Sequence, residues 1–471
     1  MPLCCLLVVI STSPAIFGTE RFAELTRKAC TSCHAGAEGG TLTSEGRAFK
    51  NSRDLLAQQA SQAKDGDGAA ADQAAPTGMS LSGSASVLAG RYLEPFADGS
   101  RRTGRGYADL RLRIDRVLGR DDLSFNTEVI GRLDDADREV RNADQVRLIT
   151  AYFRLKDPFE AREVKLGRQF VATGPRPFFL DGVNYYDELN DVVDYELFGG
   201  VPADNGEGGA QGDFAIGGRL GLTPWEQLNL GVSSTYAHDA GEPTFLQLGL
   251  DATLAATDAL ELSGHTYYDY IGEHLYDTLV RARYELDEDW SLRIDYAHVI
   301  PSLFLPKTSI FWVFANGAID EGTIDLSYAP DYHWRYHVLL RGDHFEDGGQ
   351  TVGGGGGFDY MYGNHRENVV GVDVLYLDEI RADGDAAVRV SSDLIDVRAY
   401  CRNDWTSELF TAFDLVTDLF ATGFDRNSYS VGALVGYRFT ASTVGVAGVD
   451  YLDSVQYDDR VDLHVKVTYA F

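Results

Sequence analysis

The residues Val461–Phe471, VDLHVKVTYAF, alternate strictly between apolar and polar side chains. Successive side chains of a β-strand point to opposite faces of its sheet, so this segment predicts a strand with one apolar and one polar face. A strand of this kind separates two unlike environments. The apolar face consists of Val461, Leu463, Val465, Val467, Tyr469 and Phe471, and the other face of Asp462, His464, Lys466, Thr468 and Ala470.

The same alternation recurs from Met79 to the end of the chain. Examples are ADLRLRIDRV, VRLITAYFRL, EQLNLGVSSTY, ENVVGVDVLYL and SYSVGALVGYRF. Each is about 10 residues long, the length that a tilted strand needs to cross a bilayer. Acidic, turn-rich joints such as HFEDGGQ and DEIRADGD separate these segments. In the first example, Leu110, Leu112 and Ile114 oppose Arg111, Arg113 and Asp115.

Two all-β architectures compete for this pattern. A soluble sandwich also alternates, but open sheets rarely exceed about 10 strands before they split. Here the alternation continues without a domain break, and the 25 tyrosines suit aromatic girdles at two membrane interfaces. Closure also removes the exposed edge strands of a large sheet. We therefore predict an all-β fold, a transmembrane antiparallel β-barrel of about 18–20 strands over residues 79–471.

The charge of the chain is strongly acidic. It has 72 acidic and 41 basic residues, for a formal net charge of −31. Nucleic acid is excluded as a partner because its phosphates need a basic surface. The lipid bilayer is a partner of any transmembrane barrel, and the acidic surface attracts cations.

The N-terminus carries a different kind of segment. Leu3–Ile10 is apolar and is followed by small residues, which is typical of a secretory signal peptide over residues 1–18, although no basic residue precedes Arg21. A short buried segment is the alternative. Cleavage would remove Cys4 and Cys5. The remaining cysteines are Cys30 and Cys33, which are three positions apart, and Cys401, which is expected to be a lone thiol.

The motif Cys30-Thr31-Ser32-Cys33-His34 has the C-x-x-C-H spacing that attaches a c-type haem. In a chain of this length and composition, the motif would arise by chance in about one case in a thousand. A structural zinc site needs further ligands nearby, and a thioredoxin-like pair needs a βαβ context; the sequence offers neither. Cys30 and Cys33 are therefore predicted to bind one haem c covalently, with His34 as the proximal ligand of the iron.

The haem motif lies in a small segment, residues 19–60, which we expect to be helical. Residues 61–78 are rich in Ala, Gly and Asp without apolar periodicity, and read as a linker. A segment this short cannot bury a haem alone. We therefore expect it to plug or cap the lumen of the barrel.

Two resemblances bear on this layout. A monohaem segment followed by a barrel that ends in Phe471 resembles the fused outer-membrane cytochrome–porins of iron-oxidising bacteria. The stretch CTSCHAGAEGGTLTSEGRAF resembles the start of porin-like proteins of metal-respiring bacteria. Both imply Cys30 and Cys33 as haem attachment, His34 as proximal ligand, and a bacterial outer-membrane location with the haem on the periplasmic side or in the lumen.

The leading functional expectation is an electron-transfer protein rather than an enzyme. One haem cannot span about 30 Å of hydrocarbon alone, so the partners would be a periplasmic electron-carrier cytochrome and an extracellular metal ion or surface cytochrome. The alternative is a porin for small solutes or ions with a structural or absent haem. A lumen lined by Arg111, Arg113 and acidic partners would suit that alternative.

The second axial ligand of the iron is open at the level of sequence. Met79 ends the linker and is a candidate, although it also fits as the start of the first strand. An open site or a lumen histidine is the alternative. The candidate histidines are His238, His265, His333 and His337, of which the last two are four apart and are expected to share one strand face.

Two further stretches stand out. Gly353–Gly357 lacks the Lys and Ser/Thr of a phosphate loop and predicts a strand that something inside the barrel approaches closely. Phe170–Val192 is long and aromatic, and is either a constriction folded into the lumen or an ordinary outer loop.

Overall fold

The computed structural model describes the barrel and two short strands before it. The described residues are 34–36, 39–42, 79–96, 99–134, 145–157, 162–173, 178–203, 213–239, 242–300, 317–346, 348–363, 368–381, 393–420, 427–453 and 459–471.

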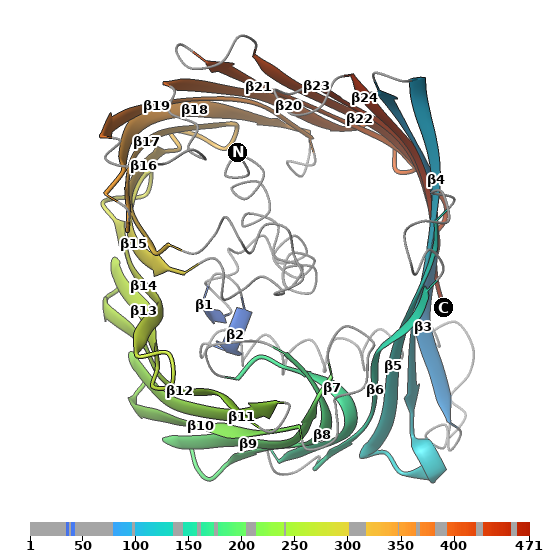
Figure 1. Cartoon of the computed structure of the whole chain (residues 1–471), viewed down its shortest axis with the longest axis vertical. Coiled ribbons are helices and arrows are strands. Elements are labelled where there is room, and N and C mark those ends of the chain that lie inside the picture. Colours follow the sequence, from blue (N-terminus) through green and yellow to red (C-terminus); the bar gives the residue numbers. More distant parts are fainter. Residues whose placement is uncertain are drawn as a thin grey trace, which may run out of the picture.

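The described chain from Met79 onward forms a closed barrel of 22 antiparallel strands, β3 to β24 (Figure 1). Each strand pairs with its neighbours in sequence, and β24 pairs with β3 to close the ring. The prediction of a closed antiparallel transmembrane-type barrel is confirmed, and the number of strands is 22 rather than about 18–20. Closure pairs every strand on both sides, which satisfies the backbone without an exposed edge.

The strands are β3 (Ser80–Phe96), β4 (Gly99–Asp115), β5 (Leu123–Asp134), β6 (Gln145–Lys156), β7 (Glu163–Val171), β8 (Phe178–Glu188), β9 (Val193–Pro202), β10 (Phe214–Trp225), β11 (Leu228–Asp239), β12 (Glu242–Thr257), β13 (Leu260–Asp269), β14 (His274–Glu285), β15 (Trp290–Val299), β16 (Ile319–Tyr328), β17 (Trp334–Phe345), β18 (Gln350–Tyr362), β19 (Asn368–Arg381), β20 (Leu394–Asp404), β21 (Leu409–Phe420), β22 (Ser428–Thr440), β23 (Thr443–Asp453) and β24 (Arg460–Ala470). A short 3-10 turn, η2 (Val117–Gly119), joins β4 to β5.

The extra strands have an identifiable source. The stretch Phe170–Val192, expected to be a loop or a constriction, contains the end of β7, all of β8 and the tight turn before β9. The alternation of β8 is hard to see in the sequence because Leu180 faces the lumen and Asp181 faces outward. In most of the other strands, apolar residues face outward and polar residues face the lumen. Two-residue turns such as 226–227 and 441–442 also join neighbouring strands. Turns this short leave no turn-rich stretch in the sequence to mark where one strand ends and the next begins.

The two rims of the barrel differ. One rim, here called the short-turn rim, carries the two-residue turns at 226–227, 258–259 and 441–442, and it holds both Ser80 and Phe471. The opposite rim, here called the long-connection rim, carries the connections over 135–144, 203–213, 300–318 and 382–393. Outer-membrane barrels have short turns on the periplasmic side and longer loops on the outside.

The outward face is apolar and ends in aromatic residues. On β22, Tyr429 and Tyr437 are 40% and 45% exposed, near the long-connection rim and the short-turn rim respectively. Eight residues at about 3.3 Å rise and about 40° tilt place them about 20 Å apart along the barrel axis. Val435 lies between them and is also exposed. This spacing fits an apolar band about 25 Å tall between aromatic girdles.

Before Met79 the structure describes two short strands, β1 (His34–Gly36) and β2 (Gly39–Leu42), which pair antiparallel. In the view of Figure 1 they project within the ring of the barrel. At His34 the backbone is therefore extended where a helix was expected, and the glycines at 36, 39 and 40 explain this because glycine disfavours helix and suits a turn. The expected signal peptide, the rest of the expected helical segment and the linker lie outside the described residues.

Across the described residues, no helix is both long and apolar enough to cross a membrane.

Candidate functional site: a charged lumen

Each strand turns every second side chain into the lumen. On β4 and β5, the Arg111 guanidinium lies 2.9 Å from the Glu128 carboxylate, and Arg113 lies 2.8 Å from Asp115. These side chains occupy the face opposite the exposed Leu110. The expectation that Arg111 and Arg113 line the lumen beside acidic partners is confirmed.

A more buried group, here called the Arg219 cluster, is formed by Arg219, Asp194, Asn229 and Asp251 on β9 to β12. Two nitrogens of Arg219 donate to the two carboxylate oxygens of Asp251 at 3.0 and 2.6 Å. Nη1 donates to Asp194 at 3.5 Å, and Nη2 to Asn229 at 3.4 Å. The Arg219 side chain is 15% exposed.

Glycine makes room for the Arg219 cluster. A Cβ at Gly231 would lie 2.3 Å from both Arg219 Nη2 and an Asp251 oxygen. A side chain there would therefore displace the ion pair. The bare backbone of Gly231 lets two charged groups from neighbouring strands meet across it.

A second group, here called the Asp359 cluster, comprises Asp359, Arg335, Tyr400, Arg398 and Asp414 on β17 to β21. Asp359 is 1% exposed and accepts hydrogen bonds from Arg335 Nε at 2.8 Å and from the Tyr400 hydroxyl. Arg398 lies over the Tyr400 ring, 5.1 Å from its centre, and donates to Asp414 at 3.0 and 2.5 Å. A buried carboxylate needs such partners because an unpaired charge is costly away from water.

A ladder of ion pairs continues the lining across β14 to β17. Each of the three arginines touches an acidic group of its own or a neighbouring strand, and the four carboxylates outnumber the arginines by one. The pairs are Arg281–Asp295 at 2.8 Å, Arg293–Asp325 at 3.3 Å, Arg341–Glu321 at 2.8 Å and Arg341–Asp343 at 3.0 Å.

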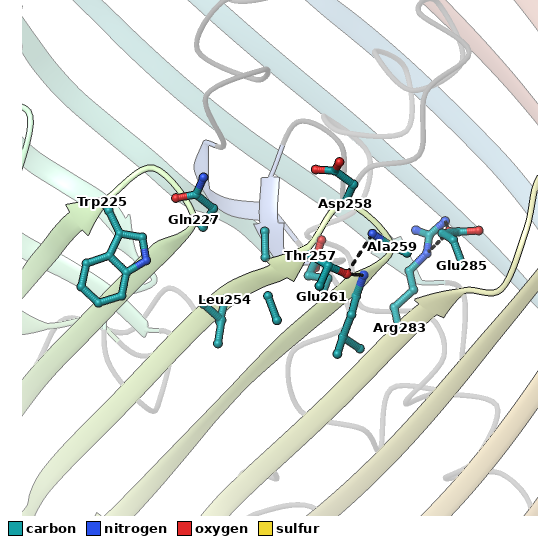
Figure 2. A pocket seen from close by; sticks show the side chains of 12 residues that line it. Trp225, Gln227, Leu254, Thr257, Asp258, Ala259, Glu261, Arg283 and Glu285 are labelled. Carbon is teal, nitrogen blue, oxygen red and sulfur yellow. Dashed lines mark hydrogen bonds and ion pairs between the residues drawn. The ribbon is translucent and has the colours of Figure 1, made fainter.

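The larger of the two described cavities lies at the short-turn rim, between the ends of β10 to β14, and has a volume of about 580 Å³. Figure 2 shows Trp225 at one end of it and Arg283 with Glu285 at the other. Arg283 and Glu285 pair at 2.7 Å, and the Thr257 hydroxyl accepts backbone N–H groups of the turn. These hydrogen bonds stabilise the turn. The residues that line the cavity are partly apolar and partly charged.

The second cavity, of about 340 Å³, lies beside the Asp359 cluster on β20 to β24. Gly432 and Ala412 are among its lining residues, together with Arg398, Tyr400 and His464. His464 approaches Asp450 at 3.4 Å. Both cavities lie along the barrel wall and offer paired charges rather than a single set of metal ligands.

The candidate histidines do not come together. His265 contacts Asp277 and His337 contacts Asp373, each at 3.2 Å and from a different part of the lumen wall. His238 was expected in the lumen, but it faces outward and stacks on Phe214, with ring centres 5.3 Å apart. Within the described ranges no group of three or more His, Cys, Asp or Glu side chains could hold a metal ion.

His333 departs from a second expectation. It lies in the connection before β17, which begins at Trp334, so it does not share a strand face with His337. Its ring contacts the Met361 carbonyl oxygen at 2.9 Å. Asp331 accepts the backbone N–H groups that follow it, and this turn ends the strand pattern that spacing alone suggested.

The predicted haem residues fall mostly outside the described structure. Cys30 and Cys33 lie outside it, and only the backbone of His34 is described, at the start of β1. Met79 directly precedes β3 and is 66% exposed. These four assignments stay predictions.

The glycine run lies in β18, as expected for a strand. The groups that approach it closely come from neighbouring strands: a Cβ at Gly357 would lie 2.2 Å from an Asp373 oxygen and 2.8 Å from the His337 ring. The Arg219 and Asp359 clusters are not among the residues that the sequence predicted. Such a cluster is indicated in the sequence by an Arg or Asp at a lumen-facing position of one strand, with glycine at lumen-facing positions of the neighbouring strands.

Comparison with known proteins gives a fold and no family. No family model and no curated protein matches the chain. A mutant of the ferric enterobactin receptor PfeA from Pseudomonas aeruginosa is similar in structure, with 9% identity, 83% of this chain and 80% of that chain covered, and a TM-score of 0.53. The chain thus has the fold of an outer-membrane β-barrel, and this comparison shows the fold alone.

Two porin structures are also similar at lower TM-scores. A BenF-like porin from Pseudomonas fluorescens Pf-5 has 11% identity, covers 83% of this chain and 98% of its own, and has a TM-score of 0.40. Pseudomonas aeruginosa OccD3 (OpdP) has 9% identity, coverages of 83% and 91%, and a TM-score of 0.38.

Proposed function

We propose that the protein is an outer-membrane porin that passes small solutes or ions through its charged lumen. The observation that carries the proposal is the inward face of a closed barrel, which is lined by ion pairs from the Arg111–Glu128 pair through the Arg219 and Asp359 clusters. Paired charges on the water-filled inner wall exchange hydrogen bonds with hydrated solutes. The apolar outward face holds the barrel in lipid.

The width of the barrel shapes the test. Porins of 16–18 strands leave an aqueous channel, whereas outer-membrane transporters of 22 strands have a plugged lumen. A 22-stranded wall thus needs something inside it to limit flow. The segment over residues 19–60, expected above to plug or cap the lumen, is the part of this chain that we propose as this filling.

The test is conductance in planar lipid bilayers of the full chain and of residues 79–471. The proposal predicts stepwise ionic currents for the full chain that rise with salt concentration, and at least a several-fold larger step for the barrel alone. Correct folding of both proteins is checked by heat-modifiable migration on gels. If both are folded and neither gives a current, the porin proposal is refuted.

A second function rests on a separate observation, the C-x-x-C-H at Cys30 to His34. Two thiols and an imidazole at this spacing are the donor set that a c-type haem needs. A bound haem would supply one-electron chemistry. The partners would be a periplasmic electron-carrier cytochrome and an extracellular metal ion or surface cytochrome, toward which the net charge of −31 would concentrate cations.

This second function has its own test. A haem-peroxidase stain of the denatured chain, with a reduced-minus-oxidised spectrum of the folded protein, should show one covalent haem. A colourless, stain-negative protein exported through a working haem-attachment system would eliminate electron transfer and leave the porin alone.

A further inference from the structure

The outward face of the barrel carries a charged pair on β7 and β8. Nε and Nη2 of Arg168 donate to the two carboxylate oxygens of Asp181 at 2.7 and 2.6 Å, and the two residues are register partners. Nη1 of Arg168 also donates to the Leu148 carbonyl at 3.2 Å. The Arg168 side chain is 15% exposed and the Asp181 side chain is 38% exposed, so Asp181 remains the more accessible of the two.

The neighbours of this pair show that it faces out. Leu166 and Phe170 flank Arg168 on the same face of β7 and are 55% and 45% exposed, and Val183 beside Asp181 is 43% exposed. Phe170 also meets Phe179 of β8, with ring centres 5.3 Å apart. The pair therefore sits among the apolar side chains that face lipid.

The height of the pair places it inside the apolar band. β8 has 11 residues, Phe178–Glu188, and spans about 25 Å along the barrel axis at the usual rise and tilt. Asp181 lies seven residues from its short-turn end and three from its long-connection end. The apolar band is about 25 Å tall, so Arg168 and Asp181 lie between its two edges.

Two other outward-facing charged contacts lie nearer the ends of their strands. Asp187 pairs with Arg162 beside the short turn, and Asp320 pairs with His298 at the opposite rim. Polar groups at those heights meet water and headgroups. Arg168 and Asp181 differ because three residues separate each of them from the long-connection end of its strand.

The inner face next to the pair is partly apolar, with apolar side chains beside the buried amide of Gln169. Leu180 and Val171 turn into the lumen and are 0% and 1% exposed, and they pack with Phe198. A slip of one residue in β8 would send Leu180 to the lipid and Asp181 to the lumen. The barrel instead holds charges outward here, where ionisable groups in lipid are costly and mark a function.

We propose that the outward face of β7 and β8 is the contact between two copies of this chain, related by a twofold axis parallel to the barrel axis. Such an axis reverses the left-to-right order of two neighbouring strands between the facing surfaces. Arg168 of each copy then lies opposite Asp181 of the other, and two ion pairs become one closed network of four charges. An isologous contact requires this kind of self-complementarity.

Charge complementarity is what selects a second copy as the occupant. The pair is neutral as a whole, so it gives no net attraction to an anionic or a cationic headgroup. A copy of itself, rotated by the twofold axis, matches both charges at once and removes them from lipid. The contact shields the exposed Asp181 carboxylate in particular.

The experiment co-expresses two full-length copies with different affinity tags and measures how much of one is captured through the other after mild detergent extraction. The wild-type chain should be captured. Arg168→Asp alone and Asp181→Arg alone should each lower capture at least tenfold, because like charges then face each other. Co-expression of these two variants with each other should restore it, because a doubly acidic face meets a doubly basic one.

A second variant guards against misfolding. Arg168→Leu with Asp181→Leu extends the apolar band, should insert normally by heat-modifiable migration, and should lose capture at least tenfold. Arg120→Asp reverses an exposed charge in the connection between β4 and β5 and should leave capture unchanged. A wild-type chain that is never captured, capture retained by the double-leucine variant, lost capture in Arg120→Asp, or no restoration in the mixed pair would each overturn the proposal.

Discussion

Phe471 and Gly83 exchange two backbone hydrogen bonds, from Gly83 N to Phe471 O at 2.9 Å and from Phe471 N to Gly83 O at 3.0 Å. They join the end of β24 to the start of β3 and so complete the ring. A Cβ at Gly83 would lie 2.2 Å from the Arg111 carbonyl oxygen and 3.1 Å from the Phe471 ring. The absence of a side chain at Gly83 is therefore part of the closure.

Replacing Gly83 by Ala should weaken this closure. We expect a loss of about 1–3 kcal/mol in the free energy of unfolding, the usual cost of overpacking, because backbone cannot move aside as a side chain would. Gly322→Ala is the matched control, since nothing lies within 4 Å of its Cβ position. Urea unfolding in lipid vesicles measures both, and equal stability of the two variants would contradict this account.

Arg219→Met should destabilise the barrel more than Arg113→Met. Arg219 is 15% exposed and holds Asp251 and Asp194, so its loss leaves partly buried carboxylates unpaired, at about 2 kcal/mol after allowance for water in the lumen. Arg113 is 51% exposed, and an exposed pair of this kind contributes about 0.2–1 kcal/mol. Equal losses in unfolding experiments would show that the Arg219 cluster is not a structural unit.

The turn between β20 and β21 should give a pH-dependent contribution to stability. Hydrogen bonds from the Ser407 and Thr406 hydroxyls lower the pKa of Glu408 below its ordinary 4.5. A lowered carboxyl pKa adds stability above the ordinary value, and that stability disappears as the pH falls through the folded pKa. The melting temperature of the wild type should therefore exceed that of Glu408→Gln at pH 7, and the difference should shrink below about pH 4.5.

For that comparison, Thr406→Val is a useful second variant because Thr406 also accepts the backbone N–H of Leu409 at 3.0 Å. It should lower the melting temperature at every pH. A Glu408→Gln difference that is the same at pH 3 and pH 7 would argue against the Glu408 contacts.

Cys30→Ala and Cys33→Ala should give a folded barrel without covalent haem. The 22 strands close on themselves, so their hydrogen bonds do not depend on the preceding segment. The peroxidase stain should vanish while heat-modifiable migration stays normal. Failure of these variants to reach the outer membrane would mean that the haem segment is part of the folding core.

Met79→Leu tests the second axial ligand. It keeps the volume and removes the sulfur, so the weak sulfur-to-iron absorption band of the oxidised protein should disappear and the potential should fall if Met79 binds the iron. Met361→Leu in β18 is the control and should leave the band in place. An unchanged spectrum in Met79→Leu would exclude this ligand and turn attention to His265 and His337, which face the lumen.

The sequence by itself determined the class of fold. A period of two is a local property, because each Cβ alternates sides whatever the neighbouring strand is, and so VDLHVKVTYAF and its repeats predict a membrane barrel with Arg111 and Arg113 inside. The C-x-x-C-H of Cys30 to His34 is equally local and is readable without a fold. The sequence also placed the glycine run in a strand.

Only the tertiary structure decided which residues meet. Arg219 lies 32 positions from Asp251, and Asp359 lies 41 from Tyr400, and pairing between strands brings each together. The strand count, the outward position of His238 and the outward position of the Arg168–Asp181 pair likewise depend on register and closure. Register is fixed by hydrogen bonds and packing between distant segments, and alternation along a single strand carries no information about them.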